Sequence, residues 1–185
     1  MSCPTLMTNR LTLRAHGVAD FDSSLALWSD PEVVRFIGGK TATAEEVWAR
    51  LLRYSGHWAL LGFGFWTIHE AATGAFVGEA GLADFRRAIT PPLGPDPEAG
   101  WVLAPQAHGR GYAREAVSAI LGWADETLQA ARTTCIIDPL NAPSLKLADK
   151  LGYRAFARGL YRGDEVVMLE RARPGAGLYV MTEEV

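Results

Sequence analysis

The sequence predicts an α/β domain with a mixed β-sheet. Segments of strand and helix character alternate along the chain, and residues 98–158 read as strand, helix, strand, helix and strand. The 185 residues are 49% apolar and 21% charged, which is typical of one globular domain with a sizeable core. We expect a single domain over residues 1–172. Residues 173–185 show no strong pattern and are predicted to form a C-terminal tail.

The first elements follow from alternation and from end signals. Residues 10–14 alternate polar and apolar side chains, as a half-buried strand does. Residues 20–39 predict a helix, a break and a second short helix. Asp30 is placed to cap this second helix and Pro31 suits its first position, while Gly38–Gly39 end it.

A longer helix and a strand pair come next. Thr43 and Glu46 have the spacing of a capping box, which predicts a helix to about residue 59. Residues 63–70 and 75–84 are rich in aromatic and apolar side chains and flank a short polar turn, a pattern typical of paired strands.

The middle of the chain holds the clearest helix. Residues 86–97 contain four prolines and predict an irregular loop, and residues 98–105 predict a strand that ends at Pro105. The apolar positions that follow recur with a helical period. They are Ala113, Ala116, Val117, Ile120, Leu121, Ala124 and Leu128.

The last elements complete the sheet. Residues 133–138 predict a β-branched strand and residues 141–152 a helix. Residues 153–158 and 165–172 predict closing strands, joined across 159–164 as a hairpin.

Charge and hydropathy argue against two classes of partner. The net charge is −3 and the pI is near 5.8, without a run of Lys and Arg, so we expect no nucleic-acid partner. No apolar stretch approaches the ~20 residues of a membrane span, so we expect no membrane partner either. Residues 1–11 lack the pattern of a signal peptide, and we expect a cytoplasmic protein.

Cysteines and histidines indicate neither a disulfide nor a metal site. Cys3 and Cys135 lie far apart in the sequence and are expected to be reduced thiols. We expect no metal, because the histidines have no metal-ligand spacing. The histidines are His16, His57, His69 and His108.

The most informative stretch is residues 106–113, QAHGRGYA, between a predicted strand and the clearest helix. The first turn of a helix has N–H groups without internal acceptors, and glycine lets an anion approach them. A P-loop would need Lys-Ser or Lys-Thr after Gly111, and a dinucleotide fingerprint would need a glycine at Arg114. On spacing alone, an anion cradle and a plain helix-starting turn remain equal alternatives.

Residues 106–113 resemble the Q/R-x-x-G-x-G/A signature of the GNAT superfamily of acyl-CoA-dependent N-acetyltransferases. Residues 141–153, NAPSLKLADKLGY, resemble the Asn-x-x-Ser segment of its RimJ/RimL-like branch. Residues 8–14 and 27–39 are similar to the opening strand and helices of that branch. The resemblance covers roughly residues 8–172.

The resemblance implies a mostly antiparallel central sheet, flanked by helices and splayed around an acyl-CoA cleft between strands 98–104 and 133–138. Strand main chain would pair with the pantetheine arm, and the glycine turn would hold the pyrophosphate. The donor-binding residues that it implies are Val102, Leu103, Ala104, Gln106, Gly109, Arg110, Gly111, Tyr112, Ala113, Asn141 and Ser144. The donor would be acetyl-CoA. For the Arg110 side chain, simple solvation is the alternative.

The chemistry is attack of a neutral amine on a thioester, so a general base is expected. Glu98 is the first candidate and Glu79 the rival; the alternative for each is a surface or salt-bridged carboxylate. A backbone N–H near Leu103 is the candidate donor to the developing oxyanion.

The leaving thiolate needs a proton or a hydrogen bond, and here the sequence departs from the superfamily. Many members carry a Tyr where this chain has Ala148. Ser144 is the candidate donor to the sulfur instead, and Asn141 is either a contact or only a helix cap. Tyr153 is expected in the core. Cys135 is expected to be a packed thiol, so direct transfer is favoured over a route through a cysteine.

The acceptor is expected to be a primary amine, either a protein N-terminal amine or a small-molecule amine. Six aromatic residues are candidates to line its site, with core packing as the alternative: Trp28, Phe36, Trp58, Phe63, Phe65 and Phe85. The resemblance also implies a homodimer. A non-catalytic acyl-CoA-binding regulatory protein on the same scaffold is the alternative function, and a nucleotide-binding module is disfavoured.

Overall fold

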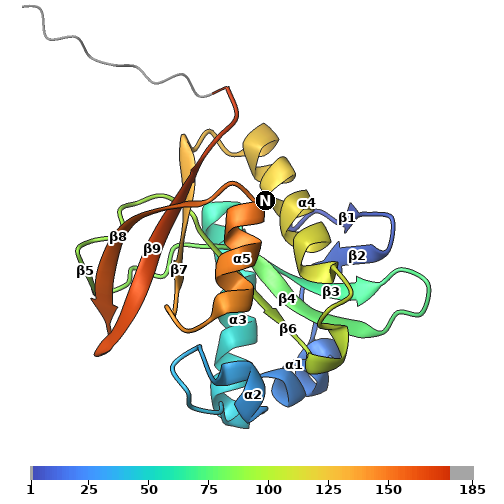
Figure 1. Cartoon of the computed structure of the whole chain (residues 1–185). Helices are drawn as coiled ribbons and strands as arrows, with labels where there is room; N and C mark the ends of the chain where they lie inside the picture. The colour runs from blue at the N-terminus through green and yellow to red at the C-terminus, as the bar shows by residue number, and fades with distance from the viewer. Residues whose placement is uncertain (1, 176–185) are drawn as a thin grey trace, which may run out of the picture.

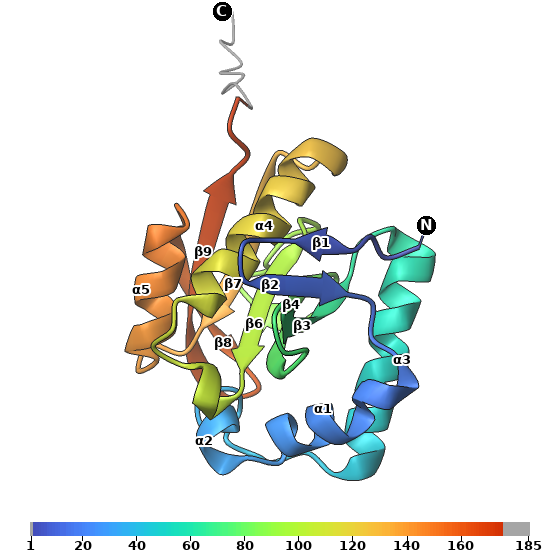
Figure 2. The ribbon, with the colours of Figure 1, turned by 90° about the vertical axis from the view of Figure 1, so that its right-hand side faces the viewer.

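The computed structural model describes residues 2–175 (Figures 1 and 2). The tail predicted at 173–185 lies largely outside these residues. The strands are β1 (Leu6–Met7), β2 (Leu11–Arg14), β3 (Phe65–Glu70), β4 (Phe76–Ala83), β5 (Ile89–Thr90), β6 (Glu98–Leu103), β7 (Arg132–Ile137), β8 (Arg154–Tyr161) and β9 (Asp164–Ala172). The α-helices are α1 (Phe21–Trp28), α2 (Pro31–Val34), α3 (Ala44–Leu61), α4 (Tyr112–Thr127) and α5 (Ala142–Lys150).

The strands form one nine-stranded sheet in the order β1-β2-β3-β4-β6-β7-β9-β8-β5. Every neighbouring pair is antiparallel except β6 with β7, which is parallel. The predicted α/β class with a mixed, mostly antiparallel sheet flanked by helices is therefore confirmed.

The predicted helix starts are present as hydrogen bonds. Thr43 Oγ1 accepts from the N–H of Glu46 at 3.2 Å, and Glu46 Oε2 accepts from the N–H of Thr43 at 2.8 Å, which completes a capping box at α3. Asp30 Oδ1 accepts from the N–H of Glu32 at 2.9 Å and starts α2. Because each cap satisfies an otherwise unpaired donor, the sequence fixes these boundaries locally.

Two segments differ from the sequence prediction. The proline-rich loop 86–97 is not wholly irregular, because Ile89 and Thr90 pair with Tyr161 and Leu160 of β8. The closing turn is also shorter than 159–164. Pairing continues to Tyr161 opposite Asp164, since partners across the hairpin satisfy the backbone groups of these residues.

The core lies where α4 packs across β2, β4 and β6 (Figure 2). Its buried face includes Ala116, Val117 and Ile120, in the predicted helical period. On the sheet, Trp66 meets the Trp58 ring edge-on at 4.6 Å between centroids. Each large apolar side chain buried here contributes about 1.5–3 kcal/mol. Ala99 and Leu103 of β6 belong to the same buried cluster.

The sheet splits between β6 and β7 (Figure 1). Strand β6 pairs with β4 from Gly78 opposite Leu103 to Ala83 opposite Glu98. On its other edge, β6 pairs with β7 at one position only, where Glu98 lies opposite Thr134. Beyond that bridge no described strand pairs with the outer edge of β6, so its backbone groups are available to a ligand.

Gly78 lets β4 approach β6 closely at the end of β6, opposite Leu103. Its φ is +153°, and a Cβ there would lie 2.3 Å from the carbonyl oxygen of Val102. We expect Gly78→Ala to lower the free energy of unfolding by about 1–3 kcal/mol, because backbone has to move. Urea denaturation measures this difference.

The matched control is Gly122→Ala, inside α4, where a Cβ meets no atom within 4 Å. This change should raise the free energy of unfolding by about 0.5–1 kcal/mol. Equal stabilities of the two variants would contradict the close-approach argument.

Candidate active site

A cavity of about 460 Å³ lies at the split between β6 and β7. Its walls come from α3, β6, β7, the start of α5 and the β8–β9 hairpin. Polar side chains that line it include Arg50, Arg53, His57, Glu98, Trp101 and Ser144. Side chains distant in sequence thus meet in one concave site, which is the usual form of a small-molecule site.

Glu98 opens β6 at the point where the strands separate. The residue is 5% exposed and lines the cavity. Arg87 donates to both of its oxygens, from Nε to Oε2 at 2.6 Å and from Nη2 to Oε1 at 2.7 Å. Burial by itself would lower the pKa of Arg87, but the hydrogen bonds and charge of Glu98 raise it on balance. Each oxygen keeps a further lone pair for a ligand donor.

Glu79 lies on β4 and is fully buried. Ser24 donates to Oε1 at 2.6 Å, Trp28 Nε1 donates to Oε2 at 2.9 Å, and His16 Nε2 lies 3.6 Å from Oε1. Burial alone would raise the pKa of Glu79, but His16 and these two hydrogen bonds lower it on balance. Unlike Glu98, Glu79 is not among the residues that line the cavity.

Ser144 lies one turn into α5 and lines the cavity. The indole N–H of Trp101 donates to Ser144 Oγ at 3.3 Å, which leaves the hydroxyl hydrogen of Ser144 for another acceptor. Asn141 caps the helix through its side chain, accepting from the N–H of Ser144 at 3.2 Å. Ala148 is fully buried, and the Tyr153 hydroxyl lies 2.8 Å from Thr133 Oγ1 in the core, as expected for Tyr153.

The glycine turn of residues 106–113 precedes α4. Gly109 and Gly111 have φ of +72° and +79°, and Gly111 is the N-cap without a side-chain hydrogen bond. A Cβ on Gly109 would meet no atom within 4 Å, so the turn is open on that side. Gln106, at the start of the turn, is exposed. Tyr112 and Ala113 are the first residues of α4, whose first N–H groups have no acceptor within the helix and point outward.

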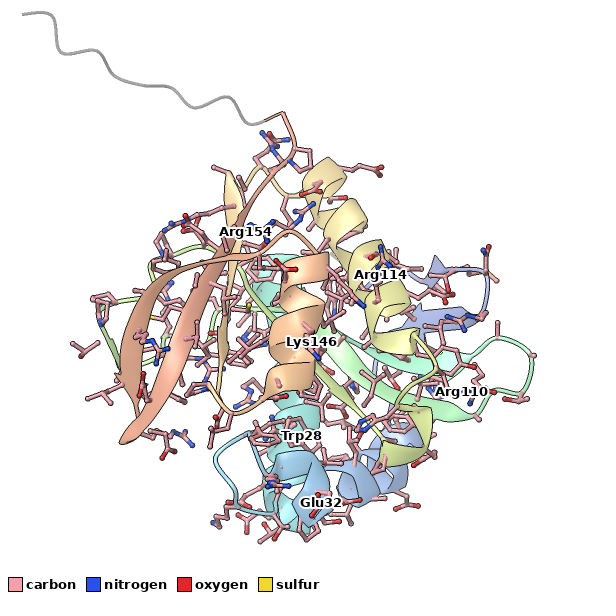
Figure 3. All side chains as sticks on the ribbon, viewed as in Figure 1. Trp28, Glu32, Arg110, Arg114, Lys146 and Arg154 are labelled. Atoms are coloured by element: carbon pink, nitrogen blue, oxygen red, sulfur yellow. The ribbon has the colours of Figure 1, made fainter. Side chains whose placement is uncertain are left out.

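Two side chains of the turn are tied to the protein. Arg110 forms an ion pair with Glu70, which also accepts from the Tyr112 hydroxyl at 2.9 Å (Figure 3 labels Arg110). His108 Nε2 lies 3.0 Å from the carbonyl oxygen of Leu103. The turn therefore offers chiefly backbone donors to a ligand.

The predicted strand contacts lie just before the turn. Val102 and Leu103 pair with Glu79 and Gly78 of β4, and the N–H of Ala104 donates to Val77 at 2.9 Å. These bonds use the inner edge of β6. The opposite edge faces the split described above.

Four of the six predicted aromatic residues line the cavity: Trp28, Phe36, Phe65 and Phe85. The other two, Trp58 and Phe63, pack in or against the main core. Sequence reasoning missed Arg50, Arg53 and Arg87, which also line the cavity. The sequence offers one indication of this position. Arg50 and Arg53 are neighbours of Leu51 and Tyr54, which are buried residues of the same helix.

Both cysteines are free thiols, Cys135 buried and Cys3 partly buried. Cys135 is fully buried where β7 borders the cavity, and burial raises its pKa above the usual range. Burial raises the pKa of Cys3 to about 12. A raised pKa disfavours the nucleophilic thiolate. Within residues 2–175 no group of three His, Cys, Asp or Glu side chains is placed to hold a metal ion, and no helix there is long and apolar enough to cross a membrane.

Comparison with known proteins decides the family. Residues 10–154 match the family described as "Acetyltransferase (GNAT) domain". The chain belongs to the GNAT acetyltransferase family. As a member of this family, and with relatives named N-acetyltransferases, it is an acyltransferase enzyme.

This acetyltransferase is 29% identical over 164 residues to the uncharacterized N-acetyltransferase p20 of Bacillus licheniformis, covering 87% of each chain. It matches the structure of a putative GnaT-family acetyltransferase from Bordetella pertussis with a TM-score of 0.81 and 33% identity, covering 91% of this chain and 99% of that one. The structure of spermidine N-acetyltransferase from Vibrio cholerae, in complex with CoA and spermine, gives a TM-score of 0.72 at 16% identity, covering 91% and 99%, which shows the shared fold.

The hydrogen bonds of the buried Glu79 carboxylate lead to a prediction about stability. Glu79→Gln keeps the shape of the side chain but its amide nitrogen cannot accept from Trp28 in place of Oε2. We expect a loss of about 2 kcal/mol in the free energy of unfolding at pH 7. The pKa of Glu79 lies below its usual 4.5, so this contribution is present above pH 4.5 and is lost as the pH falls through the folded-state pKa.

Urea titrations of both proteins between pH 7 and about pH 3 measure this difference. The exposed Glu126→Gln on α4 is the control, and its stability should match the wild type. A difference in the free energy of unfolding between the wild type and Glu79→Gln that grows as the pH is lowered would contradict the prediction.

Proposed function

We propose that the protein transfers an acetyl group from acetyl-CoA directly to a primary amine, on a protein N-terminus or a small molecule. The observation that carries this proposal is the junction of three features along β6: Glu98 at the split, a free strand edge, and the open glycine turn before α4. Family membership supports acetyl transfer to amines. The RimJ/RimL-like branch, a cytoplasmic location and a homodimer remain predictions.

The residues present suit acetyl-CoA. The outer edge of β6, at Val102, Leu103 and Ala104, would pair with the amides of the pantetheine arm. The N–H groups of the glycine turn would hold the pyrophosphate, beside Gln106. Bound acetyl-CoA supplies a thioester carbonyl that an amine attacks. Arg110 is available to a phosphate only by leaving Glu70, so backbone donors carry most of this site in our proposal.

We assign the general base to Glu98, with Glu79 as the weaker candidate. Glu98 lines the cavity and retains free lone pairs, so it could accept the proton of the amine directly or through one water molecule. The two oxygens of Glu79, in contrast, accept buried hydrogen bonds and do not line the cavity. A carboxylate at this position removes the proton that most alkyl amines carry at pH 7. A backbone N–H near Leu103 is the proposed oxyanion donor.

We assign the hydrogen bond to the departing sulfur to Ser144. Trp101 occupies a lone pair of Ser144 Oγ, so the hydroxyl hydrogen is directed to another acceptor. Asn141 supports this by capping α5 and fixing its first turn. This arrangement stands in place of the Tyr that Ala148 does not provide.

The proposal is tested by incubating the protein with acetyl-CoA and a panel of amines and N-terminal peptides while free thiol is monitored. We expect thiol release that depends on an amine, and N-acetyl products by mass spectrometry. Binding of acetyl-CoA without release for any acceptor would show a non-catalytic acyl-CoA-binding protein. Absence of CoA binding would overturn the donor site as well.

Glu98→Gln tests the base. We expect kcat to fall about a hundredfold at pH 7, within the range for a general base. The deficit should narrow at higher pH, where solvent has already deprotonated the amine. Rates of thiol release across pH measure this, with Glu126→Gln as the control. Parallel pH profiles of the variant and the wild type would remove Glu98 from the mechanism.

A further inference from the structure

The α3 wall of the cavity carries two arginine side chains without a carboxylate partner in residues 2–175, although carboxylates line other parts of the cavity, at Asp138, Asp164 and Glu165. Arg50 and Arg53 on α3 both line it, near Arg87. Arg87 is neutralised by its two hydrogen bonds with Glu98. Among the described residues, neither Arg50 nor Arg53 has a carboxylate partner; the nearby Asp84 pairs with Arg86 instead.

Partial burial makes the charge of Arg50 costly, whereas Arg53 is more exposed. Arg50 Nε is buried and has no hydrogen-bond partner among the described residues. Burial, and then the like charge of Arg50, lower the pKa of Arg53. A guanidinium that is partly desolvated and unpaired destabilises the free protein, and a bound anion removes that penalty.

Aromatic rings hold both guanidinium groups in place. Arg50 lies over the Trp28 ring, 3.6 Å from its centroid, and Trp28 is itself anchored by its hydrogen bond to Glu79. Arg53 lies 5.3 Å from the centroid of Phe85. Stacking restricts both side chains and leaves their N–H groups at the cavity, which suits a planar carboxylate.

The donor does not account for this charge. In the proposed function, the acidic part of acetyl-CoA binds at the glycine turn, and residues 106–113 do not line the cavity. The residues that we assign to the thioester, Glu98 and Ser144, do line it. An anion at Arg50 and Arg53 therefore belongs to the molecule that receives the acetyl group.

We propose that Arg50 and Arg53 bind a carboxylate of the acceptor, so that the preferred acceptor is a small amino acid-like amine that presents its amino group toward Glu98. This inference rests on the proposed function and narrows its acceptor class. Arg87 has a separate part in this proposal, because its two hydrogen bonds with Glu98 orient that side chain beside the incoming amine.

The test compares each of the standard amino acids, β-alanine and γ-aminobutyrate with its own carboxamide as acceptor. The amino groups of the α-amino amides are less basic, so reactivity alone favours the amides. We expect kcat/KM to be about tenfold or more higher for the carboxylates. Equal use of both forms, or a preference for the amides, would overturn the inference while leaving acetyl transfer intact.

Variants assign the preference to the two arginines. Arg50→Gln and Arg53→Gln should each lower kcat/KM for carboxylates by about tenfold through a raised KM, with little change for amides. Arg50→Lys keeps the charge and is the variant to use if Arg50→Gln folds poorly. Arg154→Gln is the matched control, since Arg154 is exposed, pairs with Asp149, and lies away from Trp28 in Figure 3. A preference that survives both Gln variants would overturn the assignment.

Calorimetry separates this inference from the proposed function. N-acetyl amino acids and their neutral amides are titrated into the protein without CoA. Tighter binding of the acids, lost in Arg50→Gln or Arg53→Gln, supports the carboxylate site even if no amine is acetylated. Equal binding of acids and amides overturns it even if acetylation proceeds.

Discussion

The contact between β6 and β7 at one residue pair governs the rest of the structure. Glu98 lies opposite Thr134, and the N–H of Thr134 donates to Pro97 at 3.0 Å. Past this bridge the two strands form no further pairs and diverge. Strand β6 stays paired with β4 along its whole length, and α4 packs on both of these strands. An interior strand thereby keeps one edge free, which a continuous sheet does not allow.

Two carboxylates on the paired strands β4 and β6, Glu79 and Glu98, show how similar side chains acquire different surroundings. Glu79 faces α1 and is enclosed by donors, which stabilise its charge without access to a ligand. Glu98 begins the next strand and meets one guanidinium at the cavity. Partners, more than burial, distinguish them, since both are almost completely shielded from solvent.

Much of the fold could be predicted because its signals are local. The capping box of Thr43 and Glu46, the cap at Asp30 and the apolar period of α4 each act within a few residues. The pairing of Ile89 with Tyr161 could not, because it joins segments far apart in a two-residue strand with too little pattern to detect.

The same distinction applies to the site. The glycine turn and Ser144 lie in motifs that a sequence displays, and Glu98 begins a recognisable strand. Arg50 and Arg53 occupy a helix whose apolar period explains its fold, and their position beside Leu51 and Tyr54 is too weak a local signal to distinguish them from solvated arginines. Only the tertiary packing of α3 beside Phe85 and Trp28 brings them to the cavity.

The glycine turn offers main-chain groups and the cavity is lined by side chains, and this division bears on how such enzymes diverge. Most substitutions leave backbone N–H groups in place, so the donor site that we propose at this turn would tolerate sequence change outside Gly109 and Gly111. A single replacement at Arg50 or Arg53 would change the charge presented to the proposed acceptor. One scaffold can therefore acquire new acceptors by few mutational steps while it keeps the same acyl carrier.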